Sequence, residues 1–352
     1  MDAPSIDAPR PNDLELGPNK YGDSESASSW FNPGALLSTS WDASSNIRRY
    51  IAERLSASCY IPSNPLFQQG SIMKKSLRER KSCKQRLPSA IVAGVKKCGG
   101  QQIYQFLRLH PQVAGTEKDL NFFDNVGYNV TSPEAYRLQM PYSTTKQITM
   151  DADQSLFQRP YNAPQLVRKF LSPNVKIIFV LCDPVERLLA DYFSQWMKEN
   201  SGLMNRDERV TFAMRFQASA LDKTQTFRMD ERNEFLDLSV YVQHLIRWLQ
   251  QFTTDSILAV DGDLFKLNPA SEMKKIEDFL GLRNFFRKGH FFNNDNTGQT
   301  CINFPQQFCP PRAKQHPELE DWATNKLCEF FKPYNDGLLD ILNQRMSWMN
   351  NC

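Results

Sequence analysis

The sequence lacks the features that would place it in a membrane or around a structural metal. No stretch approaches the ~20 apolar residues that a membrane-spanning helix needs, and the N-terminus has no apolar core of the signal-peptide kind. None of the eight cysteines forms a C-x-x-C pair, which argues against a zinc site. No internal repeat is visible. We therefore expect neither a membrane span nor a metal in this sequence.

The sequence also lacks a large excess of positive or negative charge. The chain has 42 Lys and Arg against 39 Asp and Glu, a net charge of +3. Such a balance argues against a dedicated nucleic-acid binder. At 41% hydrophobic and 23% charged, the composition suits a chain of 352 residues that buries a large core.

The chain changes character near residue 85. The first 45 residues are dense in Pro, Ser, Asp, Asn and Gly, which predicts disorder, and a helical stretch is expected over Asn46–Leu55. Lys74–Arg86 brings seven basic residues against one acid. This run is either a solvated linker or a contact for an anionic glycan or membrane. We divide the chain into a disordered or stem-like segment, 1–85, and one folded domain, 86–352.

Apolar runs of buried-strand type alternate with helical patterns after Leu87. The runs are 90–95, 176–181 and 256–260, and amphipathic helices are expected over 103–110, 184–196 and 241–252. Strands alternating with helices predict an α/β fold in which helices flank a parallel sheet. At the start of the second helix, Asp183 is expected as N-cap, Pro184 as first helical residue and Glu186 as capping-box partner.

The first strand runs into the basic, glycine-containing turn Lys96–Gly100 at a helix start. Backbone N–H groups there, together with the Lys97 ammonium, suit phosphate-like oxygens. The nucleotide-kinase pattern G-x-x-x-x-G-K-[ST] does not match. A tight turn without a ligand is the other interpretation of these two glycines.

Several separated segments between about residues 87 and 345 resemble the heparan sulfate glucosamine 3-O-sulfotransferases. They are Gly94–Gly100, Phe106–Pro111, Phe122–Asp124, Asp183–Arg187, Asp191–Tyr192, Tyr241–Phe252, and the Cys301 to Cys309 loop with His316–Pro317. The resemblance implies a Rossmann-like sulfotransferase fold of the P-loop type. It also implies 3′-phosphoadenosine 5′-phosphosulfate as sulfuryl donor, a glycosaminoglycan acceptor of the heparan sulfate kind, and no metal.

The resemblance also assigns site residues. It implies catalytic roles for Asp119 as base, Lys97 on the phosphosulfate, and Asp124. Acceptor contacts fall on Asn121 and Asp151. The positions implied for the donor are Lys96, Lys97, Gly99, Gly100, Gln101, Cys182, Ala190, Arg312 and Lys314.

This sequence departs from the family pattern at working positions. The family loop K-K-G-G-T-R stands here as Lys96–Gln101 with Cys98 and Gly100, and the arginine and serine that bind the 3′-phosphate are Cys182 and Ala190. Asp119 replaces a glutamate, and Ala152 replaces an acceptor-contacting lysine. The alternative is therefore an impaired sulfotransferase-fold protein that binds acidic glycan or a protein partner. A sulfotransferase for a small-molecule acceptor is a third reading.

The cysteines and one sequon bear on the compartment. Cys301 and Cys309 either close a disulfide loop or are two free thiols, and Cys98 is either a small residue in place of glycine or a reactive thiol. Asn129 begins an Asn-Val-Thr sequon for glycosylation. The resemblance implies the Golgi lumen, whereas no anchor or signal is visible, which leaves a soluble or cytoplasmic protein as the alternative.

Overall fold

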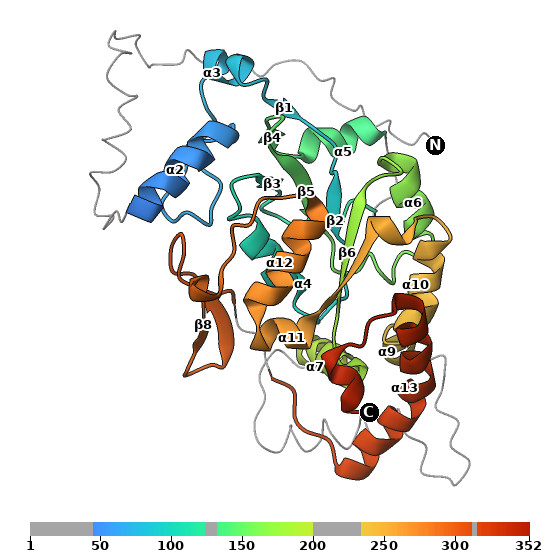
Figure 1. Cartoon of the computed structure of the whole chain (residues 1–352). Helices are drawn as coiled ribbons and strands as arrows, with labels where there is room; N and C mark the ends of the chain where they lie inside the picture. Colours follow the sequence, from blue (N-terminus) through green and yellow to red (C-terminus); the bar gives the residue numbers. More distant parts are fainter. Residues whose placement is uncertain (1–44, 124–131, 200–233, 312–314) are drawn as a thin grey trace, which may run out of the picture. The chain divides into compact units, whose positions relative to one another are not determined.

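The structure is a computed structural model that describes residues 45–123, 132–199, 234–311 and 315–352 (Figure 1). By compactness the chain divides into Met1–Arg48 and Arg49–Cys352. The description below concerns the second unit. Asp124, Asn129, Arg312 and Lys314 lie outside the described residues.

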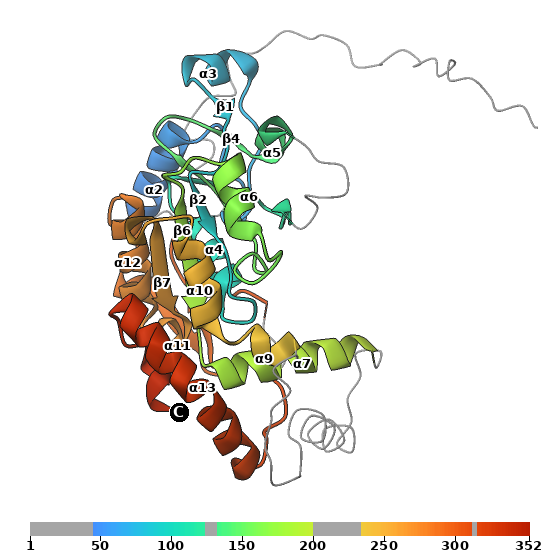
Figure 2. The same ribbon diagram turned by 90° about the vertical axis from the view of Figure 1, so that its right-hand side faces the viewer.

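A five-stranded parallel sheet forms the centre of this unit, with strand order β3-β5-β2-β6-β7. Its strands are β2 (Ala90–Val92), β3 (Val113–Gly115), β5 (Ile148–Ala152), β6 (Lys176–Leu181) and β7 (Ile257–Asp261). The strands are buried and apolar because helices cover both faces. Figure 2 shows α12 on one side of the sheet and α6 and α10 on the other. The predicted fold class is confirmed.

The helices begin and end close to the expected positions. The longer ones in the unit are α4 (Gly100–Leu107), α6 (Ala163–Phe170), α7 (Pro184–Glu199), α10 (Tyr241–Leu249), α12 (Pro269–Leu280) and α13 (Asp321–Leu342). Shorter elements are α3 (Lys75–Arg80), α5 (Pro133–Gln139), α9 (Glu234–Asp237), α11 (Gly262–Leu267) and the two-stranded pairs β1 (Lys84–Gln85) with β4 (Tyr142–Ser143) and β8 (Phe291–Asn294) with β9 (Gln299–Ile302). α2 spans Ser45–Ala57.

An aromatic cluster joins α10 to the sheet. The Phe179 ring of β6 lies 4.5 Å from the Phe157 ring and 5.2 Å from the Trp248 ring. The Trp248 indole N–H donates to the Phe157 carbonyl at 3.0 Å, so its one polar atom is satisfied inside the core. Burial of these rings fixes α10 against the strand that leads into α7.

Residues 49–85, which the sequence assigned to the N-terminal segment, lie within this unit. The Tyr50 hydroxyl donates to the Leu109 carbonyl at 2.8 Å, and Arg54 Nη1 donates to the His110 carbonyl at 3.0 Å. A disulfide joins Cys59 to Cys83. These long-range links explain why the compact unit begins at Arg49 and not near residue 86, where the sequence predicted it. They tie a segment of weak hydrophobic pattern to the domain.

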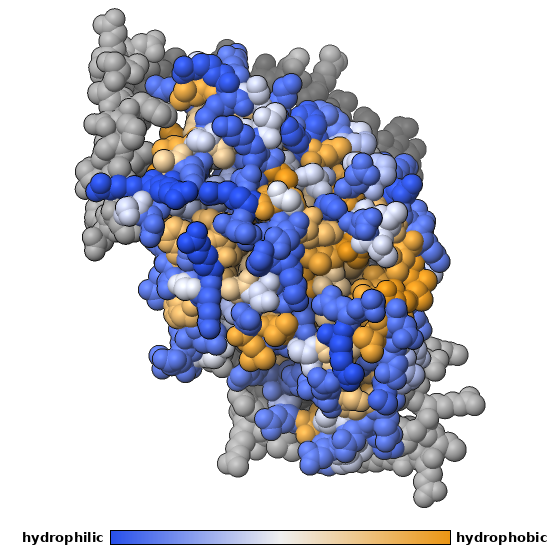
Figure 3. Space-filling view, viewed as in Figure 1, coloured by the Kyte–Doolittle hydropathy of each residue, from blue (hydrophilic) through white to orange (hydrophobic). Residues whose placement is uncertain are grey.

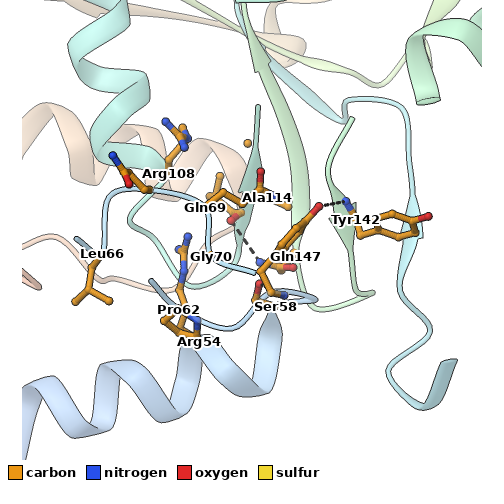
Figure 4. A pocket seen from close by; sticks show the side chains of 14 residues that line it. Arg54, Ser58, Pro62, Leu66, Gln69, Gly70, Arg108, Ala114, Tyr142 and Gln147 are labelled. Carbon is orange, nitrogen blue, oxygen red and sulfur yellow. Dashed lines mark hydrogen bonds between the residues drawn. The ribbon is translucent and has the colours of Figure 1, made fainter. Parts of the chain in front are cut away.

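A small cavity remains where this segment meets β3. Figure 4 shows Arg54, Ser58, Gly70, Ala114 and Gln147 around it. Its volume is about 30 Å³. Ligand pockets are typically ~300 Å³ or more, so this cavity is not a candidate site.

The start of α7 confirms one half of the predicted cap and corrects the other. Asp183 Oδ1 accepts from the Val185 N–H at 2.9 Å, as an N-cap does. The capping-box partner was expected to bond the Asp183 N–H, but that group donates to Asp263 Oδ2 of α11 at 2.9 Å. Glu186 instead pairs with His316 at 3.0 Å. A neighbouring element therefore supplies the second partner, which local spacing could not show.

Candidate functional site

A cleft of about 1000 Å³ opens at the carboxyl ends of the parallel strands. Open α/β sheets usually bind ligands there, because the loops after the strands converge at that edge. Four lysines line the cleft: Lys96, Lys97, Lys198 and Lys266. The other lining residues include Gly99, Gly100, Gln101, Gln102, Gln105, Gln154, Ala190, Phe193, Ser194, Met197, Gln299, Thr300, Pro310, Pro311 and Gln315. The cleft thus combines cations with amide donors, a lining that suits a large anion.

The turn after β2 delivers both cations and helix N–H groups to this cleft. Gly99 is the residue before α4 and has a φ of 91°, a conformation that favours glycine. Lys97 has a φ of 77°, which L-residues seldom adopt. Backbone in that region persists only when the surroundings hold it. The surrounding structure therefore holds this turn in a conformation that places the Lys97 side chain at the cleft.

The two lysines of the turn, Lys96 and Lys97, differ in their ion pairs. Buried Asp191 pairs with Lys96 and with Arg187. Lys96 Nζ lies 2.6 Å from Asp191 Oδ1, while Arg187 Nη1 lies 3.2 Å from the other carboxylate oxygen of Asp191. Arg187 also donates to the Ser239 hydroxyl at 2.7 Å. Lys97 has no ion pair among the described residues and is exposed to the cleft. Lys97 is therefore the loop cation that is available for a ligand.

The electrostatics around Lys97 favour an anion. Desolvation lowers the pKa of Lys97 first, and the cations Lys96, Lys198 and Arg187 lower it further. Asp191 acts in the opposite direction. An anionic ligand would offset both unfavourable contributions, because opposite charge favours the protonated ammonium.

A disulfide joins the turn to the end of β6. Its cysteines, Cys98 and Cys182, are buried, and the Tyr241 hydroxyl donates to the Cys182 carbonyl at 3.0 Å. The sulfur of Cys98 is therefore neither a free reactive thiol nor a simple glycine replacement. The Cys182 sulfur is used in this bond, so the position implied for a 3′-phosphate arginine is structural here.

Gly100 makes room for a neighbouring amide. A Cβ atom at Gly100 would lie 2.5 Å from Gln154 Oε1, too close for any side chain without movement. The Gln154 amide, which follows β5, thus packs over the first residue of α4. Gln154 Nε2 also donates to Gln101 Oε1 at 3.5 Å. This contact was missed from the sequence, since no local pattern links the two segments.

Asp119 lies beside the cleft and is linked to it through Gln101. A side-chain hydrogen bond from Gln101 lowers the pKa of Asp119, but desolvation is the larger effect and raises it overall. The carboxylate is exposed at the end of the β3 segment. A raised pKa makes the carboxylate a stronger base, which suits proton abstraction.

The two positions implied for acceptor contact lie in different surroundings. Asn121 is exposed, with a φ of 44°. Asp151 is only 2% exposed, and its carboxylate accepts from the Thr116 hydroxyl at 2.8 Å and the Tyr136 hydroxyl at 2.7 Å. Burial raises the pKa of Asp151 to about 6. The Asp151 carboxylate is therefore engaged with two protein hydroxyls.

Three described residues close in sequence to positions 312–314 line the cleft wall: Pro310, Pro311 and Gln315. The disulfide Cys301–Cys309 closes the loop that follows β9 of the hairpin β8–β9, so of the two interpretations of these cysteines the disulfide loop is confirmed. Gln102 Nε2 of α4 donates to the Thr300 carbonyl of this hairpin at 2.6 Å, so the hairpin is fixed to the helix that begins at the site.

Comparisons with known proteins agree with this geometry. The profile of the Sulfotransferase domain matches residues 87–293. The chain is 30% identical over 271 residues to human heparan sulfate glucosamine 3-O-sulfotransferase 6, covering 75% of each chain. It is 27% identical over 286 residues to human heparan sulfate glucosamine 3-O-sulfotransferase 5, covering 80% of each.

This chain belongs to the sulfotransferase family. A crystal structure of a sulfotransferase from Alicyclobacillus acidocaldarius has the same fold, with a TM-score of 0.51, 16% identity and coverage of 75% of this chain and 99% of that one. The sulfuryl donor of the family is 3′-phosphoadenosine 5′-phosphosulfate. In this sulfotransferase the Lys97 ammonium, which has no ion pair within the described part of the chain, and the N–H groups at the start of α4 fit its phosphosulfate group.

Two further findings concern metals and membranes. Among residues 45–123, 132–199, 234–311 and 315–352, no group of three or more His, Cys, Asp or Glu is placed to hold a metal ion. Within the same ranges, no helix is both long and apolar enough to cross a bilayer.

Proposed function

We propose that this sulfotransferase moves a sulfuryl group from 3′-phosphoadenosine 5′-phosphosulfate to a glucosamine hydroxyl of a heparan sulfate-type glycosaminoglycan. The observation that carries the proposal is Lys97 of the turn before α4, which lines the cleft and has no ion pair among the described residues, together with Asp119, a carboxylate of raised pKa that is hydrogen-bonded to the cleft residue Gln101. The curated relatives named above support the acceptor class.

The proposed reaction is an in-line displacement at sulfur. Asp119 takes the proton of the acceptor hydroxyl as its oxygen bonds to sulfur, and the bond from sulfur to the bridging phosphate oxygen breaks. Lys97 neutralises the charge that develops on that departing phosphate oxygen. Asn121 is proposed to contact the acceptor directly, whereas buried Asp151 would act through its electrostatic interaction with Asp119.

The remaining residue assignments are proposals of the same kind. Lys96, Gly99, Gly100, Gln101 and Ala190 would border the donor, since all of them line the cleft. Arg312, Lys314 and Asp124, outside the described residues, are retained as proposed donor and catalytic residues from the resemblance. The same holds for glycosylation at Asn129.

We place the reaction in the Golgi lumen. All eight cysteines form disulfides, at 59–83, 98–182, 301–309 and 328–352. Disulfides in this number are typical of proteins that fold in oxidising compartments.

One specific observation favours a second candidate, an impaired protein that binds acidic glycan. The implied 3′-phosphate partners are absent, because Cys182 is bonded to Cys98 and Ala190 has no hydroxyl. The loss of hydrogen bonds to a charged group costs roughly 1.5–3 kcal/mol each. Donor affinity could therefore fall below what turnover needs.

The test is transfer of labelled sulfate from the donor to heparan sulfate by the purified full chain, compared with Asp119→Asn. We expect transfer by the wild type and a loss on the order of 10²- to 10⁴-fold in the variant. Asp119→Glu, which restores the family carboxylate, is the matched control and should retain or raise the rate. A folded wild type that binds heparan sulfate but transfers nothing would favour the second candidate.

A further inference from the structure

The basic segment 74–86 forms an ordered surface of the domain. Its exposed cations are Lys74, Lys75, Arg80 and Lys84, on and next to α3. None of these four has an ion pair with any residue that the structure describes. We call these four residues the α3 basic surface.

The other cations of the segment hold it in place. Lys81 Nζ donates to the Ser58 carbonyl at 2.7 Å and also to the Leu55 carbonyl. The Arg78 guanidinium lies 5.0 Å from the centre of the Tyr142 ring. Together with the disulfide Cys59–Cys83, these contacts fix the backbone that presents the four exposed cations. The segment is therefore a rigid part of the fold and not a solvated linker.

Positive charge accumulates here, with seven basic residues against one acid in the segment. Burial lowers the pKa of Lys81, and repulsion from Lys146 lowers it further. Lys146 is exposed, and Glu79 is the single acid of the segment. Cations at this density attract anions and release counterions when a polyanion binds.

This surface is separate from the cleft. α3 precedes β1, which leads into the amino end of β2, whereas the cleft lies at the carboxyl ends of the strands. Figure 1 shows α3 at the top and α7 and α11, which follow the carboxyl ends of β6 and β7, toward the bottom. Figure 3 shows hydrophilic residues over the α3 region. A ligand on this surface would leave the donor site accessible.

We propose that the α3 basic surface binds an extended sulfated polysaccharide chain at a site distinct from the catalytic cleft. The exposed hydroxyl residues Ser76 and Ser82 between the cations provide hydrogen-bond donors for sulfate and carboxylate oxygens. Stable binding of a basic surface to an anionic membrane commonly takes a second contribution, such as large apolar side chains that enter the lipid. Within 58–86 and 132–147 only two isolated aliphatic residues, Ile72 and Leu138, are exposed, with no exposed aromatic.

The test measures binding of a fluorescent heparin dodecasaccharide to the full chain by anisotropy, at about 50 and about 300 mM NaCl. The variant carries Lys74→Gln, Lys75→Gln, Arg80→Gln and Lys84→Gln. The matched control carries Lys274→Gln, Arg287→Gln, Lys288→Gln and Lys332→Gln, which remove the same charge from exposed positions elsewhere. Lys97→Ala reports on the cleft, and circular dichroism checks that each variant is folded.

We expect the α3 variant to lose about tenfold or more in heparin affinity at low salt and to show a weaker salt dependence, while the control changes less than about threefold. Equal losses in the α3 variant and the control would overturn the proposal. So would a loss of binding to phosphatidylserine vesicles with heparin affinity intact. Donor-nucleotide binding, measured in parallel, separates this outcome from a failure of the proposed sulfotransfer.

Discussion

The two corners of the donor cleft have different chemistry, although both lie where a parallel strand meets a helix. At the β2–α4 corner, an unpaired lysine and helix N–H groups face the cleft. At the β6–α7 corner, Cys182 is bonded to Cys98, and Asp183 and Arg187 are engaged in a cap and a buried ion pair. The side chains of the first corner are placed to bind an anion, whereas those of the second corner stabilise the fold. Donor affinity should therefore depend mainly on the β2–α4 corner.

The largest effect is expected from removing the bond between the corners. Cys98→Ser with Cys182→Ser should lower the free energy of unfolding by about 2–5 kcal/mol, because the disulfide closes a loop of more than eighty residues. It should also weaken nucleotide binding, since the turn that holds Lys97 at a positive φ loses its anchor. Denaturant unfolding and calorimetric titration measure the two effects. Cys59→Ser with Cys83→Ser, which removes a disulfide whose cysteines do not line the cleft, is the control for binding, and equal nucleotide affinities in the two double variants would contradict the role of the first bond.

The β2–α4 corner is also sensitive to the space above Gly100. Gly100→Thr, which restores the family threonine, should destabilise the protein by no more than about 1 kcal/mol, because the new Cβ displaces Gln154 Oε1, the end of a flexible side chain. The same change combined with Gln154→Ala should recover most of that loss. Thermal unfolding of both variants tests this, and a double variant as unstable as the single one would show that the contact is not the cause.

A smaller effect concerns the base beside this corner. Gln101→Leu removes the hydrogen bond that lowers the pKa of Asp119, so that pKa should rise. The acid limb of the pH–rate profile should then move to higher pH, with activity lost at low pH and retained above the new pKa. Gln105→Leu, which changes another cleft glutamine, is the control. An unchanged acid limb would argue against Asp119 as the titrating base.

The smallest effect lies at the β6–α7 corner. Desolvation lowers the pKa of His316, but the hydrogen bonds to Glu186 and the Pro317 carbonyl and the nearby carboxylates together raise it overall, and the hydrogen bond to His316 lowers the pKa of Glu186. The pair should therefore add stability between roughly pH 4.5 and 6.5. The contribution is lost as His316 deprotonates above its raised pKa and as Glu186 protonates at low pH. Since the Glu186 side chain is 62% exposed, His316→Gln should cost no more than about 1 kcal/mol. Thermal unfolding at pH 5.5 and pH 8 should show a larger loss at pH 5.5, and a larger loss at pH 8 would reverse the sign.

Sequence patterns were sufficient where local chemistry decides the structure. β6 was predicted at Lys176–Leu181 because five consecutive apolar residues, all buried in the structure, precede a capping signal. The N-cap at Asp183 followed from short-range spacing as well, and spacing offered the Cys301–Cys309 disulfide as one of two interpretations. These features depend on residues close together in the chain.

The rest of the site depends on contacts between distant segments. Spacing could not pair Cys98 with Cys182 across 84 residues, nor place Gln154 over Gly100. Lys198 and Lys266 reach the cleft from α7 and α11, and neither stands in a motif. The partner of Glu186 likewise comes from a residue 130 positions away. Such contacts are set by the packing of the sheet and its helices.

The claim that donor binding depends mainly on the β2–α4 corner can be tested directly by calorimetry. Adenosine 3′,5′-bisphosphate and adenosine 5′-monophosphate are each titrated into the wild type and Lys97→Ala. The two nucleotides differ only in the 3′-phosphate. We expect wild-type affinities within about tenfold of each other, and a loss of about tenfold or more for both nucleotides in Lys97→Ala. A bisphosphate preference of about 100-fold or more, retained in Lys97→Ala, would contradict the assignment of donor binding to the β2–α4 corner.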